Sequence, residues 1–349
     1  MRFDRSALER FGSDLLQAAG CEKDTANLVA RTLVRSDARG TASHGLIRVL
    51  DYAERLRKGG NDPHGQPQLL NQRGAVGVID GGGALGQLVG DFAMRLAIEL
   101  AHEHGIGAVA CRNSSHFGAA AEYSLLAADN DCIGVVLTNA SASMAPFGGI
   151  TPVLGNNPFA VAAPTDPPDV FALDLALSVV AKGRIRMLAA RGERIPEGWA
   201  NDKRGVPTTD PAEALTGLAA WAGGYKGYGL ALAADALTGV LSGGGYGPCV
   251  GAQSDASRPQ NVAHFMMAVH VPHFLPIEVF RDRMTDLLKA MRSSDLAGDS
   301  PGIRIPGELE AQAEGLSAIA GIEIVDEVWK RLEAFVTTVN VSIPSPVPS

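Results

Sequence analysis

The 349-residue sequence predicts an α/β protein in which helices cover a mixed sheet. Short apolar runs alternate with helical patterns through the middle of the chain, and amphipathic helical patterns occupy both ends. Hydrophobic residues make up 46% of the chain and charged residues 19%, with a net charge of −8, which excludes a disordered chain. The length is sufficient for one large domain or two intertwined domains with a substantial core.

Three helices are predicted at the N-terminal end. Apolar positions at helical spacing place them at residues 5–19, 24–38 and 43–58. Ser43 is expected to cap the third helix, which puts His44 at its first position and Arg48 one turn later on the same face. The polar segment 61–73 is expected to be an exposed connection.

The rest of the chain contains the predicted strands and further helices. Strands are expected at residues 75–79, 106–110, 133–138, 159–163, 170–173 and 264–271. Helices are expected at residues 87–104, 119–130, 175–190, 277–293 and 325–338, together with a buried helix after Gly224. The proline-rich end of the chain, residues 341–349, is expected to form a flexible tail.

The composition argues against several function classes. The mild acidity disfavours a general nucleic-acid binder, and no stretch of about 18 uncharged apolar residues is present to cross a membrane. The four cysteines lie far apart without a CxxC pair, so we expect reduced thiols in a cytoplasmic protein. His102 and His104 point to different faces of a predicted helix, and we expect no metal site.

A glycine-rich segment, Gly81-x-Gly83-x-x-Gly86, matches the dinucleotide-binding fingerprint between a predicted strand and a predicted helix. In a chain with 41 glycines, however, such a pattern also arises by chance. The acidic residue expected after the next strand is missing, and Arg112, which could bind a 2′-phosphate, lies near that place. The residues alone leave open a Rossmann phosphate loop and a plain turn, and they favour the turn.

Two histidines are candidate proton-exchanging groups. A neutral His44 beside Arg48 suits a substrate carboxylate next to a group that exchanges a proton, but a surface histidine after a capping serine explains the same residues. His116 follows a predicted strand, where active-site loops are common, and the alternative is a histidine hydrogen-bonded in a turn. Ser115 beside it suggests a hydrolase, but the chain has no GxSxG elbow.

Three further segments could meet a ligand. The loops 138–143 and 155–158 are rich in small polar groups whose backbone N–H groups could contact a ligand, or they form ordinary turns. Lys226 precedes a predicted helix and could pair with a phosphate, or it is a solvated lysine.

Seven motifs in order carry a resemblance to a known family. They are TASHGLIR at 41–48, HGIGAVACRNSSHFG at 104–118, TNAS at 138–141, GNNP at 155–158, LDLA at 173–176, GGYKGYGL at 223–230 and RIPGE at 304–308. Together they resemble the malate/L-lactate dehydrogenase family of the second type. That family also contains ureidoglycolate, sulfolactate and diketogulonate oxidoreductases and the cyclic imino-acid reductases.

The resemblance implies a fold that is not Rossmann and a nicotinamide cofactor, NAD or NADP. A mixed-sheet cofactor domain, residues 73–274, would be joined to a helical domain built from both chain ends, residues 1–72 and 275–340. Members of the family are typically homodimers that bind cofactor and substrate between the domains. The segment Gly81–Gly86 is not the family's phosphate loop.

The resemblance also implies roles for individual residues. His116 matches the residue that gives and takes the proton, His44 and Ser43 match a pair beside the substrate, and Arg48 matches a carboxylate-binding arginine. Asn156 and Lys182 are expected to face the substrate. Both lie at departures from the family: many relatives have Thr where this chain has Asn156, and imino-acid reductases have an Asp after the glycine in the stretch that here reads Lys182-Gly183-Arg184. Cofactor contacts are expected from Phe117, Gly118, Ser141, Asp174, Leu175, Ala176, Lys226, Gly227, Arg304, Pro306 and Gly307.

The predicted function is therefore reversible hydride transfer between NAD or NADP and a small 2-hydroxy acid of the malate, lactate, sulfolactate or ureidoglycolate type. Three alternatives stay open: a cyclic imino-acid reductase of the same family, a Ser-His hydrolase and a non-catalytic nucleotide-binding protein. The departure at Lys182 disfavours the reductase.

Overall fold

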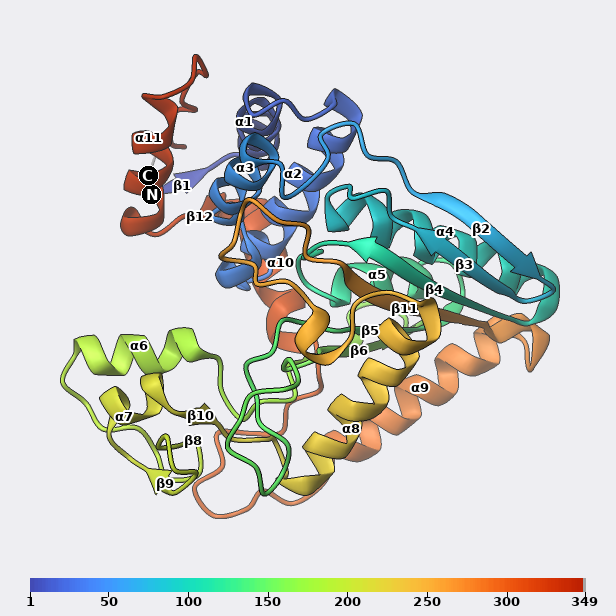
Figure 1. Ribbon diagram of the computed structural model, residues 1–349. Helices are drawn as coiled ribbons and strands as arrows, with labels where there is room; N and C mark the ends of the chain where they lie inside the picture. The colour runs from blue at the N-terminus through green and yellow to red at the C-terminus, as the bar shows by residue number, and fades with distance from the viewer. Residues whose placement is uncertain (348–349) are drawn as a thin grey trace.

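A seven-stranded mixed sheet forms the centre of the protein (Figure 1), in a computed structural model that describes residues 1–347. The strands in spatial order are β2 (Gln68–Arg73), β3 (Val76–Asp80), β4 (Ile106–Ser114), β11 (Val262–His270), β5 (Cys132–Thr138), β6 (Phe159–Ala163) and β7 (Phe171–Leu175). Only β3 and β4 pair in parallel, and β11 is inserted between two strands far earlier in the chain. The predicted mixed-sheet α/β class is confirmed, and the strand order is not that of a Rossmann fold.

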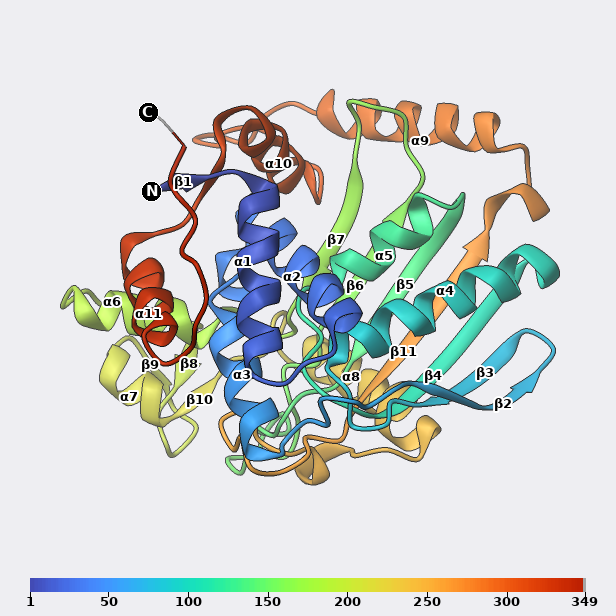
Figure 2. The same ribbon diagram turned by 90° about the horizontal axis from the view of Figure 1, so that it is seen from above.

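Helices cover both faces of this sheet (Figure 2). On one face, α4 (Gly86–His104) and α5 (Ala121–Ala128) bury a core that includes Val89, Val109 and Met266. On the other face lie α8 (Tyr225–Asp235) and the π-helical turn Ala236–Val240. The expectation of a buried helix after Gly224 is wrong for one side of α8, because Leu230 is 61% and Leu232 49% exposed.

A layer of helices from both chain ends packs beside the sheet (Figure 2). It contains α1 (Arg5–Ala18), α2 (Lys23–Ala38), α3 (Arg48–Lys58), α10 (Glu308–Ala320) and α11 (Asp326–Val336). The short strands β1 (Arg2–Phe3) and β12 (Ile322–Glu323) pair and bring the two ends together. Trp329 of α11 stacks on Phe3 with ring centroids 4.2 Å apart. The chain ends therefore share one hydrophobic core.

The expected tail runs along this layer as far as the structure describes it. The backbone N–H of Val347 donates to Arg2 at 2.9 Å, and Val341 packs on the helical core. Residues 348–349 of the expected tail lie outside the described residues.

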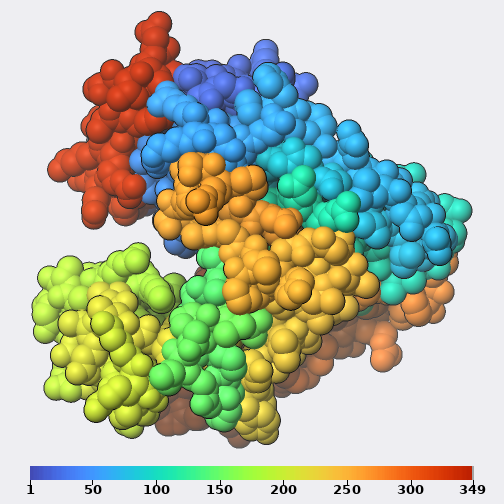
Figure 3. All heavy atoms as spheres, viewed as in Figure 1, coloured from blue at the N-terminus to red at the C-terminus, as the bar shows by residue number. Residues whose placement is uncertain are grey.

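A small lobe projects from the sheet domain. It consists of α6 (Lys182–Ala190), β8 (Ala200–Asn201), β9 (Pro207–Thr208), α7 (Pro211–Thr216) and β10 (Leu218–Ala219). Figure 3 shows a notch between this lobe and the helical layer. The long helix α9 (Ile277–Arg292) lies near β7 at the far edge of the sheet (Figure 2). No helix among the described residues is long and apolar enough to cross a membrane.

The sequence-based prediction for residues 61–73 is wrong in part, because β2 forms the edge of the sheet there. All six residues of β2 are exposed, and it pairs with β3 alone. An edge strand with both faces in solvent needs no alternating apolar pattern, so the sequence carries no periodic signal for it.

Candidate active site

One cavity of about 540 Å³ brings together segments that are far apart in the sequence. Its walls come from the turn before α3, the loop before α5, the end of β7 and the segment before α10. The predicted site residues that line it are Ser43, His44, Gly118, Asn156, Asp174, Leu175, Ala176, Arg304, Pro306 and Gly307. Part of the substrate and cofactor segments expected from the resemblance therefore share one cavity.

The turn that carries Ser43 and His44 differs from the expected helix start. Residues Ala42–His44 form a single 3-10 turn, and α3 begins only at Arg48, so Ser43 does not cap it. The helix starts late because of a contact from α2, where the Asp37 carboxylate accepts a 2.6 Å hydrogen bond from the N–H of Leu46. A Cβ at Gly45 would lie 1.9 Å from that carboxylate, so only glycine fits between them. Burial raises the pKa of Asp37 to about 7.

The two predicted histidines pack against each other, and His44 lines the cavity. The rings of His44 and His116 stack with centroids 5.5 Å apart and planes 14° apart. Burial lowers the pKa of His44 to about 4, with a further contribution from the cation of Arg48. Burial also holds the pKa of His116 well below its usual range, and His44, Arg48 and His264 add to the effect. Both rings are neutral at pH 7.

Arg48 lies beside both rings. Its Nε donates to the carbonyl oxygen of Ser43 at 2.7 Å, and its guanidinium pairs with Asp51 at 2.9 Å. These contacts fix the guanidinium next to His44 and leave other N–H groups of its planar fork free for an anion. The hydroxyl of Ser43 lies 3.0 Å from Nδ1 of His44, so the predicted pair is present on one turn.

The glycine-rich turn supports the loop that carries His116. Gly83 donates its N–H to the carbonyl oxygen of Asn113, and Gly86 donates to the Ser115 hydroxyl at 2.9 Å. A Cβ at Gly86 would lie 2.2 Å from the carbonyl oxygen of Ser115. None of Gly81–Gly86 lines the 540 Å³ cavity. The segment is a close-packed turn, and Ser115 is a buried hydrogen-bonding residue in it, not an exposed nucleophile.

Arg112, the candidate 2′-phosphate binder, pairs instead with Asp80 at 3.1 Å. Phe117, another predicted cofactor contact, lies beneath the cavity wall and stacks on His264 with centroids 4.4 Å apart. His264 is fully buried in β11 between the Thr138 and Ser114 hydroxyls, each 2.8 Å away. His264 therefore packs beneath the loop that carries His116 and Phe117, on the side of the sheet.

Asp174 lies in β7, and its carboxylate reaches the start of α5, where it accepts a hydrogen bond from the N–H of Ala121 at 2.8 Å. Burial raises the pKa of this carboxyl despite that hydrogen bond. Seven predicted site residues lie outside the cavity lining, namely Arg48, His116, Phe117, Ser141, Lys182, Lys226 and Gly227. Gly227 has a packing role, since a Cβ there would lie 2.1 Å from the carbonyl oxygen of Ala222. Lys226 is exposed at the start of α8.

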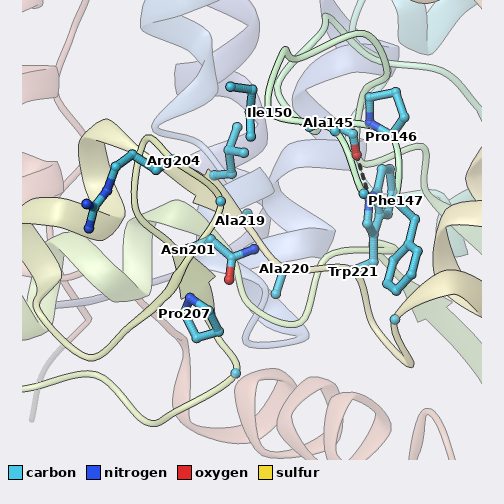
Figure 4. Close-up of a pocket in the computed structure, with 16 residues that line it drawn as sticks. Ala145, Pro146, Phe147, Ile150, Asn201, Arg204, Pro207, Ala219, Ala220 and Trp221 are labelled. Carbon is cyan, nitrogen blue, oxygen red and sulfur yellow. Dashed lines mark hydrogen bonds between the residues drawn. The ribbon is translucent and has the colours of Figure 1, made fainter.

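A second cavity, of about 560 Å³, lies between the loop 145–150 and the small lobe. Figure 4 shows Trp221 in its wall, with the indole N–H donating to the carbonyl oxygen of Ala145 at 2.7 Å. Arg204 also lines it, but its guanidinium pairs with Asp202. None of the predicted site residues lies among its lining residues. The slightly smaller cavity beside the histidines is the candidate active site.

Sequence reasoning missed two side chains that form a hydrogen-bonded chain from His116. Tyr52 of α3 places its hydroxyl 2.8 Å from Nδ1 of His116, and Gln87 of α4 donates to that hydroxyl at 2.8 Å. Tyr52 lies four residues after Arg48, and this spacing was the signal that could have identified it. Gln87 had no such signal, because its contact depends on the packing of α4 against α3.

Comparisons with known proteins place the chain in a family. Residues 3–333 match the family model described as Malate/L-lactate dehydrogenase, so the chain belongs to this family. It is 37% identical to the malate dehydrogenase of Pyrococcus abyssi, covering 98% of this chain and 96% of that one. It is 32% identical to the ureidoglycolate dehydrogenase (NAD(+)) of Escherichia coli K12, with 95% of each chain covered.

A solved structure gives the same result for the fold. The sulfolactate dehydrogenase of Methanocaldococcus jannaschii superposes with a TM-score of 0.92 at 35% identity, covering 98% of both chains. The resemblance found in the motifs is thus confirmed over nearly the whole chain. The protein is an oxidoreductase of the malate/L-lactate dehydrogenase family.

Proposed function

We propose that this protein is an NAD- or NADP-dependent dehydrogenase of small 2-hydroxy acids. The observation that carries the proposal is the stacked pair of neutral histidines beside Arg48, of which His44 lines the 540 Å³ cavity. A neutral imidazole can take the hydroxyl proton of a 2-hydroxy acid, and the guanidinium can hold its carboxylate. The relatives named as malate, sulfolactate and ureidoglycolate dehydrogenases support this substrate class.

The cavity fits a dinucleotide in size and chemistry. Its volume lies within the range of cofactor pockets. Gly118 and Gly307, both with φ in the left-handed region, keep its wall free of side chains where the chain turns. Asp174 offers a carboxylate to a ribose hydroxyl, and Arg304 offers a cation to a phosphate. When bound, the nicotinamide ring accepts or gives the hydride.

In this mechanism, His116 is the proton-exchanging group. Its depressed pKa keeps it neutral at pH 7, so it can accept the hydroxyl proton as hydride leaves the substrate carbon. Arg48 and His44 orient the carboxylate, and the Ser43 hydroxyl fixes the His44 ring. In the reverse direction, protonated His116 returns the proton to the keto oxygen. Asn156 lines the same cavity and is assigned to the substrate side.

We also propose a homodimer in a reducing, cytoplasmic compartment. An exposed apolar stripe suited to a second copy is formed by Leu230, Leu237 and Leu241, which are 40–61% exposed. Leu237 lies about two helical turns after Leu230, and Leu241 about three. The described cysteines form no disulfide, which agrees with reduced thiols. Light scattering of the wild type and of Leu237→Glu tests the dimer: the variant should be monomeric, and an unchanged mass would refute the stripe as the interface.

The activity itself is tested with a panel of 2-keto acids and both reduced nicotinamide cofactors. The panel contains oxaloacetate, pyruvate, 3-sulfopyruvate and the keto acid of ureidoglycolate, together with a cyclic imine carboxylate. Loss of the reduced-nicotinamide absorbance with a keto acid supports the proposal and identifies the preferred cofactor. Turnover of the cyclic imine alone would assign the reductase alternative, and no turnover with cofactor bound would assign a non-catalytic nucleotide binder.

A further inference from the structure

The inner edge of the His116 ring faces a buried chain of two side chains. The Tyr52 hydroxyl lies 2.8 Å from Nδ1, and the Gln87 amide lies 2.8 Å from that hydroxyl. Tyr52 is 1% exposed and Gln87 is fully buried. The other amide atom of Gln87, Oε1, is buried and has no hydrogen-bond partner within residues 1–347. A buried acceptor without a partner is unfavourable, so this amide needs an explanation.

The direction of the hydrogen bonds in this chain decides which nitrogen of neutral His116 carries the proton. A phenol has one hydrogen to donate. If Gln87 donates its N–H to Tyr52, the hydroxyl donates to Nδ1 and the ring proton sits on Nε2. If the amide makes half a turn about its last bond, Oε1 accepts the Tyr52 hydrogen instead. The hydroxyl then accepts from Nδ1–H, and Nε2 carries a lone pair.

We propose that Tyr52 and Gln87 are positioning residues that hold a proton on Nδ1 of His116 and so keep Nε2 as the proton-exchanging atom. This inference rests on the proposed function. When a 2-hydroxy acid is oxidised, its carbon–hydrogen pair leaves as hydride for the nicotinamide and its hydroxyl proton bonds to Nε2. Reduction reverses both transfers. Nδ1 keeps its hydrogen throughout, so the chain through Tyr52 to Gln87 stays unchanged during turnover.

One feature of the site supports this direction. The opposite direction would put N–H on Nε2 of the neutral ring, which could not then accept a proton from the substrate. In the proposed direction Oε1 of Gln87 accepts from Tyr52, and the amide nitrogen takes the buried position in which Oε1 has no partner. The N–H of Gly118 points at Nδ1 from 3.4 Å and opposes a proton there, but this contact is much longer than the 2.8 Å contact to Tyr52.

The effect of the chain on the proton affinity of His116 can be separated from that of its neighbours. The titratable or charged groups facing the ring are His44 from the 3-10 turn, Arg48 and Tyr52 from α3, and His264 from β11. His44, Arg48 and His264 lower the pKa of His116, as burial does. A Tyr52 oxygen that accepts Nδ1–H opposes them, because a hydrogen bond from imidazolium is stronger than one from neutral imidazole.

The variant Tyr52→Phe tests the proposal through the pH profile of kcat/KM. The limb assigned to His116 should move to lower pH by roughly half to one unit, the difference between a charged and a neutral hydrogen bond. We expect kcat to fall by about 10-fold while the KM for the acid substrate changes little, and Gln87→Met should move the limb in the same direction by less. A limb that moves to higher pH means that the chain runs in the opposite direction. An unmoved limb means that Tyr52 only fills space, and either result overturns the proposal.

The matched control is Tyr123→Phe. Tyr123 is also a buried phenol, but its hydroxyl donates to the carbonyl oxygen of Phe117 and not to the ring of His116. Its loss should leave the position of the pH limb unchanged, whatever it does to stability. A shift equal to that of Tyr52→Phe would show that any buried phenol near this loop has the same effect, which would overturn the assignment.

A measurement without turnover tests the tautomer by itself. The ¹⁵N chemical shifts of the His116 ring in the free wild-type protein are assigned by their absence in His116→Asn. The proposal predicts a protonated, pyrrole-type Nδ1 and a pyridine-type Nε2 at neutral pH, and the reverse pattern would overturn it. Because no substrate is present, this result is independent of the proposed function, which fails separately if no 2-hydroxy acid is oxidised.

Discussion

The substitution Gly86→Ala should damage catalysis through the loop that carries His116. The added Cβ would lie 2.2 Å from the carbonyl oxygen of Ser115 and 2.6 Å from that of His116. Relief of this contact requires about 1 Å of movement, and a misplacement of about 1 Å at a catalytic group can cost on the order of 100-fold in rate. We therefore expect kcat to fall about 100-fold, while the cofactor Kd, measured by fluorescence titration, stays within a few-fold.

The control for this variant is Gly83→Ala, in the same turn. Its Cβ would meet Asp62 at 3.7 Å, an ordinary contact, but its φ of +69° is strained for alanine. We expect a loss of roughly 1–2 kcal/mol of stability, a lower melting temperature and an almost unchanged kcat. Normal turnover of folded Gly86→Ala would refute the role of the turn in supporting His116. A large loss of cofactor affinity in both variants would instead restore the Rossmann interpretation of this segment.

Two further predictions concern the turn before α3. Arg48→Lys keeps the charge but loses the planar fork and the hydrogen bond to Ser43. A lost charge-assisted hydrogen bond costs about 1.5–3 kcal/mol, so kcat/KM for the acid substrate should fall roughly 10- to 150-fold. The cofactor Kd should hold, and a rise in that Kd alone would contradict the assignment; Arg57→Lys on the same helix is the control. For Asp37, whose folded pKa of about 7 exceeds its unfolded value, stability should fall as the pH rises from about 4 to 7. Asp37→Asn should remove this dependence and raise stability at pH 8 by up to about 4 kcal/mol, and melting curves with unchanged pH dependence would contradict this.

The sheet and the helices that cover it could be predicted because their apolar patterns are strong. The strand predicted at 159–163 has those bounds in the structure, since β6 lies inside the sheet with a run of small apolar residues. The small lobe could be predicted only in part. The helix expected at 175–190 is helical only over α6, Lys182–Ala190, and the strands of the lobe are two residues long and carry no periodicity. The same limit applies to the exposed edge strand β2.

The candidate site was predictable only in part from individual residues. The motif set pointed to His44, His116 and Asp174, but no local pattern shows that β7 and the segment before α10 share a cavity with them. The helix predicted from residue 43 was wrong at its start, because the Asp37 carboxylate on a neighbouring helix binds Leu46 and ends the pattern. Tertiary contacts of this kind override a local capping signal.

The central claim is that His116 exchanges the substrate proton during hydride transfer. The most direct measurement is single-turnover oxidation of the preferred 2-hydroxy acid by His116→Asn, with cofactor binding measured on the same sample. His64→Asn, a histidine on the surface that contacts Glu22, is the control. We expect a rate at least about 100-fold below wild type for His116→Asn, with an unchanged cofactor Kd and a normal rate in the control. A near-normal rate in His116→Asn would contradict the claim.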